Sequence, residues 1–205
     1  TEAAPRAAPY KEFVVSDSHR VRVRDVVALC VLIVVLAVSL DSRGTLGTDS
    51  GGKLATLEEM ERTSSATPDV GYWAGAQDPD GIAHPLYYTQ RFGDSWVNVT
   101  TLPMLLAARP LYEAGGTRLA LALPGLGGVL TALAAGALAN RLGSRSPRTA
   151  FWVIGAASPV LVYALDLWEH TLGVAAMAWA IVALVDAVDS RRHRLMWITV
   201  GAGFG

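Results

Sequence analysis

The stretch LALALPGLGGVLTALAAGALA, residues 119–139, contains no charged side chain. A helix that crosses the hydrocarbon core of a bilayer needs about 20 mostly apolar residues. Three further blocks are almost as free of charge, residues 26–40, 150–167 and 172–188. Over the whole chain 17% of residues are charged, against roughly 25% in soluble domains. The sequence therefore predicts an all-α fold, a multi-pass transmembrane helical bundle. Its spans are expected at about 24–41, 118–140, 149–167 and 171–188.

Two end segments complete the predicted organisation. Residues 1–21 contain two prolines and many alanines, and they predict a disordered cytoplasmic tail. The apolar run 195–205 is uninterrupted at its last residue, and we expect it to begin a fifth span that continues further. Residues 22–205 would then form the N-terminal part of a transmembrane domain. Cys30, the single cysteine, lies inside the first block and is expected to act as a small apolar side chain.

The basic residues predict the orientation, because Lys and Arg in short loops stay on the cytoplasmic side of a membrane. They cluster in alternate loops, and the connection 168–171 has none. We therefore expect a multi-pass protein of the cell membrane with a cytoplasmic N-terminus and an extracytoplasmic first outer loop, residues 42–117. A net charge of −1 gives no basic excess for a nucleic-acid partner, and membrane lipids are the expected surroundings. The clusters are Lys11, Arg20, Arg22 and Arg24, then Arg141, Arg145 and Arg148, then Arg191, Arg192 and Arg194.

The outer loop is long for a connection between spans, and such loops are generally functional or disordered. Aromatic residues such as Trp73 and Trp96 argue against disorder. In residues 53–62 apolar side chains recur every three positions opposite three glutamates, which predicts a short amphipathic helix lying on the membrane surface. A second juxtamembrane helix is predicted over 102–111. Turns are predicted at 78–81 and at Gly115-Gly116.

The loop opens with the candidate site Thr-Asp-Ser-Gly-Gly-Lys, residues 48–53. Asp49 would lie near the bilayer surface, where its carboxylate could take a proton from an acceptor. Lys53, one or two turns away, could neutralise a phosphate. The same pattern also fits a turn, or an N-cap for the helix that begins at Lys53. Spacing alone leaves both interpretations open.

Taken together, this layout resembles the GT-C superfamily of membrane glycosyltransferases. Within that superfamily it is similar to the branch of protein mannosyltransferases and aminoarabinose transferases. The resemblance covers about residues 22–205. It implies an inverting transfer of a sugar from a polyprenyl-phosphate donor to an unidentified acceptor at the outer membrane face. The motifs that carry it are the hexapeptide 48–53, Leu-Tyr-Glu-Ala-Gly-Gly-Thr-Arg at 111–118 and Tyr-Ala-Leu-Asp-Leu-Trp-Glu-His at 163–170.

In this family an acid of the first outer loop acts as general base or helps to bind a metal, and Asp49 occupies that place. Many relatives have a second acid beside it, where this chain has Ser50. That departure argues against a two-carboxylate or metal-binding version of the site. A divalent metal stays an option, with no cofactor required and no metal-ligating residue assigned. Relatives also carry further spans, so we expect the segment up to Gly205 to be inactive by itself.

The leaving phosphate needs a cation, and the outer-side candidates are Lys53, Arg43 and Arg91, each of which could equally be a solvated charge. Glu169 and His170 close the third span on the same predicted face. They are candidate hydrogen-bond partners for the loop or the acceptor, or else simple interfacial anchors.

Two other functions stay open. A transporter or flippase would have acids or broken helices near the middle of several spans, whereas the polar residues here gather at the outer ends. A noncatalytic membrane scaffold would use the outer loop to bind a partner and would not need Asp49.

Overall fold

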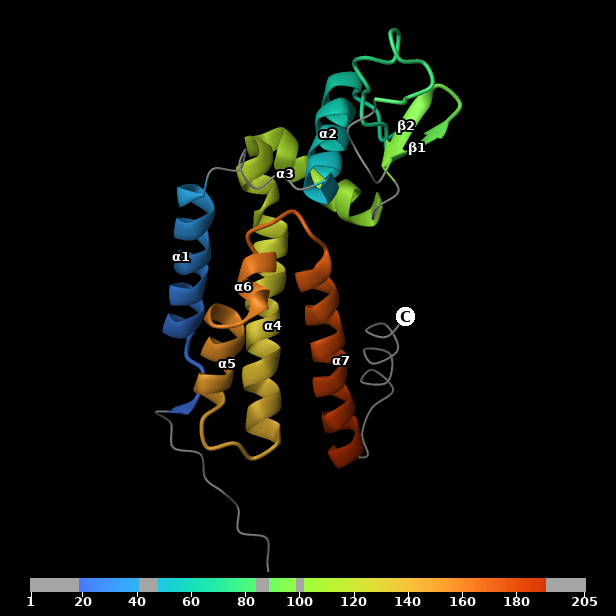
Figure 1. Cartoon of the computed structure of the whole chain (residues 1–205). Coiled ribbons are helices and arrows are strands. Elements are labelled where there is room, and N and C mark those ends of the chain that lie inside the picture. Colours follow the sequence, from blue (N-terminus) through green and yellow to red (C-terminus); the bar gives the residue numbers. More distant parts are fainter. Residues whose placement is uncertain (1–18, 41–47, 84–88, 99–101, 191–205) are drawn as a thin grey trace, which may run out of the picture.

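The computed structural model describes residues 19–40, 48–83, 89–98 and 102–190. The predicted tail 1–21, most of which precedes residue 19, and the predicted fifth span 195–205 lie outside these ranges. The described chain is mostly helical (Figure 1). The helices are α1 Val23–Ser39, α2 Thr48–Thr63, α3 Leu102–Ala120, α4 Ala122–Arg141, α5 Pro147–Ala156, α6 Pro159–Tyr163 and α7 His170–Ser190, and the strands are β1 Thr89–Phe92 and β2 Ser95–Asn98.

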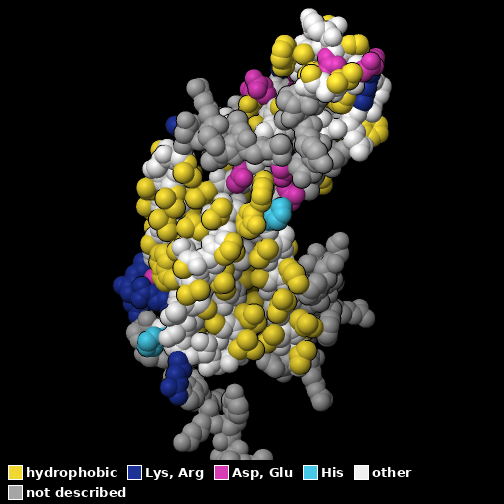
Figure 2. Space-filling model, viewed as in Figure 1, with side chains coloured by type: hydrophobic (Ala, Val, Ile, Leu, Met, Phe, Trp, Pro, Cys, Tyr) yellow, Lys and Arg dark blue, Asp and Glu magenta, His cyan; other side chains and the backbone are white. Residues whose placement is uncertain are grey.

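Helices α1, α4, α5, α6 and α7 form a bundle, and α2, α3 and the strands lie beyond one end of it (Figure 1). The bundle core joins Leu29 and Ile33 of α1 to Val129 and Ala132 of α4 and to Phe151 of α5. Figure 2 shows apolar side chains over much of this face of the bundle, with Lys and Arg gathered near the end where α1 begins.

Two of the described helices are long and apolar enough to cross a membrane. They are α4, over its full length, and α7, over His170–Val188. They match the predicted spans 118–140 and 171–188 to within a few residues. At the start of α4, Pro124 has no N–H to donate to the carbonyl of Ala120, and the helix is interrupted at Leu121. The helical prediction is thus confirmed for both segments.

The third predicted span, 149–167, is not one helix. It divides into α5 and α6, because Pro159 lacks the N–H that a continuous helix would require. Ser158 begins α6 as its N-cap, with its hydroxyl accepting from the N–H of Val160 at 3.2 Å. After Tyr163 the chain turns until α7 begins at His170. This break leaves residues 164–169 as a non-helical connection at the end of the bundle next to α2.

The amphipathic segment 53–62 is helical, but the helix begins earlier, at Thr48. Leu57 and Met60 have no exposed surface, and Leu57 packs with Leu105 and Ala108 of α3 and with Leu167 of the α6–α7 connection. The prediction that this apolar face lies on the membrane surface is therefore wrong, because protein covers it. Helix α2 is fixed to the bundle instead.

Helix α3 includes the predicted segment 102–111 and contains the predicted turn. Gly115 and Gly116 break its helical geometry, and Gly116 has φ 64°, a conformation that only glycine adopts readily. The hairpin was not predicted from an all-α fold. Its strands pair Phe92 with Ser95 across a two-residue Gly93-Asp94 turn, and Gly93 has φ 61°. Glycine followed by Asp at such a turn is a known hairpin signal.

Candidate functional site at the junction of α2 and the α6–α7 connection

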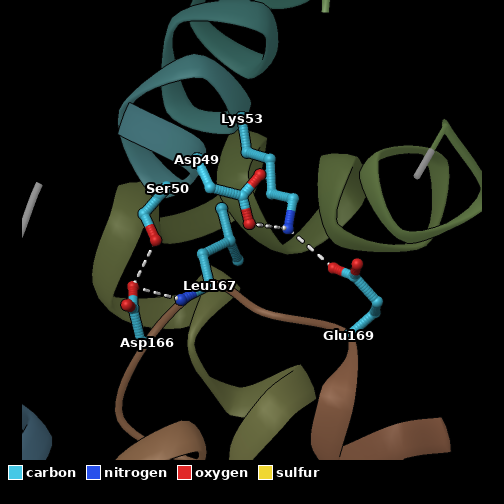
Figure 3. A network of polar contacts seen from close by, with 6 residues as sticks. All are labelled: Asp49, Ser50, Lys53, Asp166, Leu167 and Glu169. Atoms are coloured by element: carbon cyan, nitrogen blue, oxygen red, sulfur yellow. Dashed lines mark hydrogen bonds and ion pairs between the residues drawn. The ribbon is translucent and has the colours of Figure 1, made fainter. Parts of the chain in front are cut away.

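The first turn of α2 lies against the connection 164–169, and polar side chains meet there (Figure 3). Asp49, Ser50 and Lys53 come from α2, whereas Asp166 and Glu169 come from the connection. Three carboxylates and one ammonium group form this cluster, which we call the α2 junction. The structure therefore brings together three of the residues singled out by the sequence, Asp49, Lys53 and Glu169.

Lys53 lies at the centre of the α2 junction and has no exposed side-chain surface. Its Nζ donates to Oδ2 of Asp49 at 2.9 Å and to Oε2 of Glu169 at 2.6 Å. Removing an ammonium group from water costs several kcal/mol unless partners compensate, and the two carboxylates provide that compensation. Because its charge is already matched, Lys53 holds the two acids in place and presents no surface to a ligand.

A second contact joins the same two segments. The hydroxyl of Ser50 donates to Oδ1 of Asp166 at 2.5 Å, and the N–H of Leu167 donates to the same oxygen at 2.8 Å. Hydrogen bonds to an ionised carboxylate are shorter and stronger than neutral ones. Ser50, 2% exposed, thus fixes the first turn of α2 over the connection. The sequence showed Ser50 only as a departure from the resemblance, and nothing in it links Ser50 to Asp166.

Asp49 has one carboxylate oxygen that no described residue binds. Its Oδ2 accepts from Lys53, but its Oδ1 is buried and has no hydrogen-bond donor within the described part of the chain. Asp49 lies in the first turn of α2, where the helix dipole favours a negative charge. Its side chain is 20% exposed. The unfilled acceptor position on Oδ1 could take the proton of a ligand O–H or N–H group. Because Oδ1 is buried, such a group reaches it only when the side chains that cover it move.

The aromatic residues beside the α2 junction form a stack. The ring of His170 lies 5.3 Å from that of Tyr163 and 5.1 Å from that of Trp168, centroid to centroid. His170 is exposed, and its ring contacts are with these two aromatic side chains. Tyr163, Asp166 and Trp168 also line an open pocket of about 650 Å³ on the bundle side of the connection. Asp166 therefore borders both the polar cluster and this pocket.

Of the remaining predicted site residues, the structure describes Arg91, which is not brought to this place. Arg91 lies on β1 and donates to the carbonyls of Gly93 and Pro79, so its contacts are within the hairpin and the neighbouring turn. Arg43 lies in segment 41–47, outside the described residues. Across the ranges described, no group of three or more His, Cys, Asp or Glu side chains is placed to hold a metal ion.

The opposite end of the bundle carries separate ion pairs. Arg141 of α4 binds both carboxylate oxygens of Asp186 of α7. Arg148 donates to Oδ1 of Asp25, which is 2% exposed. These contacts join α4 to α7 and α5 to α1 at the end remote from Asp49. In comparisons with known proteins, the chain matched no family model, no curated protein and no solved structure.

Proposed function

We propose that this chain belongs to a membrane glycosyltransferase, in which Asp49 is the general base for sugar transfer from a polyprenyl-phosphate donor to an acceptor hydroxyl. The observation that carries the proposal is the Oδ1 atom of Asp49, a buried acceptor without a donor, beside an Oδ2 atom fixed by Lys53. A base must be held within hydrogen-bond reach of the proton it removes. The Lys53 contact supplies that orientation.

The proposed placement is a multi-pass bundle with the α2 junction at the extracytoplasmic face of the cell membrane. It is supported by the two long apolar helices α4 and α7 and by the arginines at the end of the bundle remote from Asp49, which fit the cytoplasmic side. A lipid-linked donor keeps its tail in the bilayer and its phosphate at the interface. A base at the outer end of a helical bundle would meet such a donor there.

The proposed reaction is a single displacement. The acceptor oxygen bonds to the anomeric carbon, and the bond from that carbon to the phosphate oxygen breaks. The acceptor proton goes to Oδ1 of Asp49, and the polyprenyl phosphate leaves with the electron pair of the broken bond. Attack from the face opposite the phosphate inverts the anomeric configuration.

The contacts of Lys53 change the role we propose for it. Two carboxylates already bind its buried ammonium group, so we assign Lys53 to hold Asp49 and Glu169 rather than to bind the donor phosphate. With three acids and one cation, the α2 junction has an excess of negative charge. Stabilising the phosphate would require another cation, and Arg43 stays a candidate because it precedes α2 by few residues.

The proposal is tested by Asp49→Asn in the natural protein, measured in its own membranes with a polyprenyl-phosphate-linked sugar as donor. Loss of a general base typically lowers the rate by about 10²–10⁴-fold. Asp94→Asn is the matched control, because Asp94 is an exposed acid on the hairpin turn. Wild-type transfer by the Asp49→Asn protein, at normal expression, would show that Asp49 is not the base.

A noncatalytic scaffold is the second candidate, and one observation favours it. Lys53 binds Asp49 and also Glu169, which lies 116 positions after Lys53 in the sequence, and such a contact also suits a purely structural clamp between the outer segment and the bundle. A clamp predicts that Asp49→Asn lowers thermal stability and any transfer in proportion. A general base predicts that transfer falls far more than the folded fraction does.

A further inference from the structure

An open pocket of about 560 Å³ lies at the end of the bundle remote from Asp49. Its rim carries Arg20 and Arg22, just before α1, and Arg141 at the end of α4. Its lining also includes the apolar side chains of Val26, Leu133 and Trp179, together with Asn140. Guanidinium groups above an apolar wall match an amphiphile that has an anionic head and a hydrocarbon tail.

Local packing explains why the pocket has this form. A Cβ atom on Gly136 would lie 2.8 Å from Cγ2 of Val21, so glycine at this position of α4 lets the segment before α1 approach closely. Val21 stands between Arg20 and Arg22, and its approach brings both arginines to α4. On the other side, Nε1 of Trp179 donates to the carbonyl of Leu130 at 3.1 Å, which fixes the indole in the wall.

Two acids described at this end of the bundle, Asp186 and Asp25, bind arginines. Asp186 binds Arg141 through both oxygens, and Asp25 binds Arg148 and the N–H of Arg22. Arginine binds phosphate through two parallel N–H donors, and basic pockets between spanning helices on the cytoplasmic side bind anionic lipid head groups.

We propose that this pocket binds the phosphodiester head of an anionic glycerophospholipid of the inner leaflet. Arg20 and Arg22 hold the phosphate, and an acyl chain lies along Val26, Leu133 and Trp179. The proposal rests on the membrane placement given under Proposed function, but it is independent of glycosyl transfer.

The test uses the purified protein in lipid nanodiscs and a photoactivatable phosphatidylglycerol as the probe, titrated with and without competing phosphatidylcholine. The cross-linked peptides are identified by mass spectrometry. In the native protein we expect cross-links on α4 and α7 near the pocket wall, displaced by phosphatidylglycerol and not by phosphatidylcholine. An arginine near the surface contributes about five-fold to binding of an anionic lipid, so Arg20→Gln with Arg22→Gln should weaken binding roughly 25-fold.

The matched control is the double variant Arg24→Gln with Arg145→Gln. Both arginines are exposed at the same end of the bundle and do not line the pocket, so this control removes the same charge from the same face. If the control lost as much phosphatidylglycerol binding as the Arg20→Gln, Arg22→Gln variant, binding would reflect diffuse electrostatic attraction and the proposal would be overturned. Displacement of the cross-links by phosphatidylcholine as effectively as by phosphatidylglycerol would also overturn it. Recovery of the protein in the soluble fraction would overturn it together with the membrane placement. Selective phosphatidylglycerol binding by an Asp49→Asn protein that lacks transfer would support it.

Discussion

The Oε2 atom of Glu169 lies 2.6 Å from Nζ of Lys53, 116 positions earlier in the chain. This contact fastens helix α2 to the connection that precedes α7. Because Lys53 also binds Asp49, the orientation of the proposed base depends on a residue of the bundle. A shift in the start of α7 should therefore change the orientation of Asp49, because Glu169 and Lys53 connect the two.

Lys53→Met should destabilise the protein and disorder the α2 junction. It removes the ammonium group of the α2 junction, which binds both Asp49 and Glu169. Breaking a fully buried ion pair costs roughly 3–5 kcal/mol. The loss here should be smaller, because the two acids are 20% and 33% exposed and water can reach them. Thermal unfolding in detergent measures the effect.

Arg62→Met is the control for Lys53→Met. Arg62 lies on the same helix and pairs with Glu59, but its side chain is 70% exposed. Exposed pairs contribute about 0–1 kcal/mol. A midpoint shift in Arg62→Met as large as that in Lys53→Met would mean that the Lys53 contacts do not fix α2 to the bundle.

The sequence was informative where one local signal dominated. Length and apolar character were enough to predict the helices over 118–140 and 171–188. Pro159 marked the break within 149–167, but a proline inside a span is also compatible with a kinked continuous helix. The pattern could not distinguish these outcomes, because the packing of the neighbouring helices decides between them.

The α2 junction was predictable only in part. Alternating loops of arginines placed Asp49, Lys53 and Glu169 on one side of the bundle. Their direct contact depends on the position of α2, which the sequence assigned to the membrane surface. Apolar residues at every third position show which face of a helix is apolar, but they do not show what covers that face. The bond from Ser50 to Asp166 depends on the same tertiary packing.

Gly81→Ala should destabilise the β1–β2 hairpin and the turn beside it more than Gly93→Ala does. Both glycines have positive φ, 67° and 61°, so each substitution carries a left-handed penalty of about 1–2 kcal/mol. At Gly81 the new Cβ would also lie 2.0 Å from the ring of Trp96, whereas at Gly93 it would meet nothing within 4 Å. Forced overpacking adds roughly 1–3 kcal/mol.

Hydrogen exchange provides the measurement for this pair of variants. The N–H of Val70 donates to the carbonyl of Trp96, and that of Asn98 donates to the carbonyl of Pro68. Both amides should exchange faster in Gly81→Ala than in Gly93→Ala. Equal exchange rates would place the Trp96 ring away from Gly81 in solution.

The turn at 78–83 should open in acid. The pKa of Asp78 is lowered from its ordinary 3.8, chiefly because its carboxylate accepts from the N–H of Ala83, and also through hydrogen bonds from Tyr72 and Ile82, while desolvation opposes the shift. Because the pKa of Asp78 is lower in the folded protein than in the unfolded chain, the ionised carboxylate stabilises the turn fully at any pH above the unfolded pKa. That contribution is lost as the pH falls through the folded pKa.

Pepsin cleavage measures this opening, because pepsin is active in acid. Cleavage within residues 72–83, normalised to an unfolded reporter peptide, should rise as the pH falls below about 4. Asp78→Asn removes the titrating group. Its cleavage should therefore be faster than that of the native protein at the upper end of the pH range tested, and nearly independent of pH. A steep acid-dependent rise in Asp78→Asn would assign the titration to another group.

Gly127→Ala should separate α4 from α7, whereas Gly173→Ala should not. A Cβ on Gly127 would lie 2.6 Å from Oγ1 of Thr171 and 2.7 Å from N of Leu172, but a Cβ on Gly173 would meet nothing within 4 Å. The clash also threatens the hydrogen bond from Thr171 Oγ1 to the carbonyl of Pro124 at 2.9 Å. Overpacking and loss of this bond should together cost roughly 1.5–4 kcal/mol, whereas alanine at Gly173 should stabilise the helix by about 0.5–1 kcal/mol.

Thermal unfolding and transfer activity should respond together to Gly127→Ala. Thr171 is two residues beyond Glu169, so displacing the start of α7 moves the carboxylate that holds Lys53 and, through it, Asp49. We therefore expect a lower unfolding midpoint and a loss of transfer in the fraction that stays folded. Gly173→Ala, on α7 two residues after Thr171, should retain both. If the folded Gly127→Ala protein kept full transfer activity, the geometry of the α2 junction would not depend on the packing of α7 against α4.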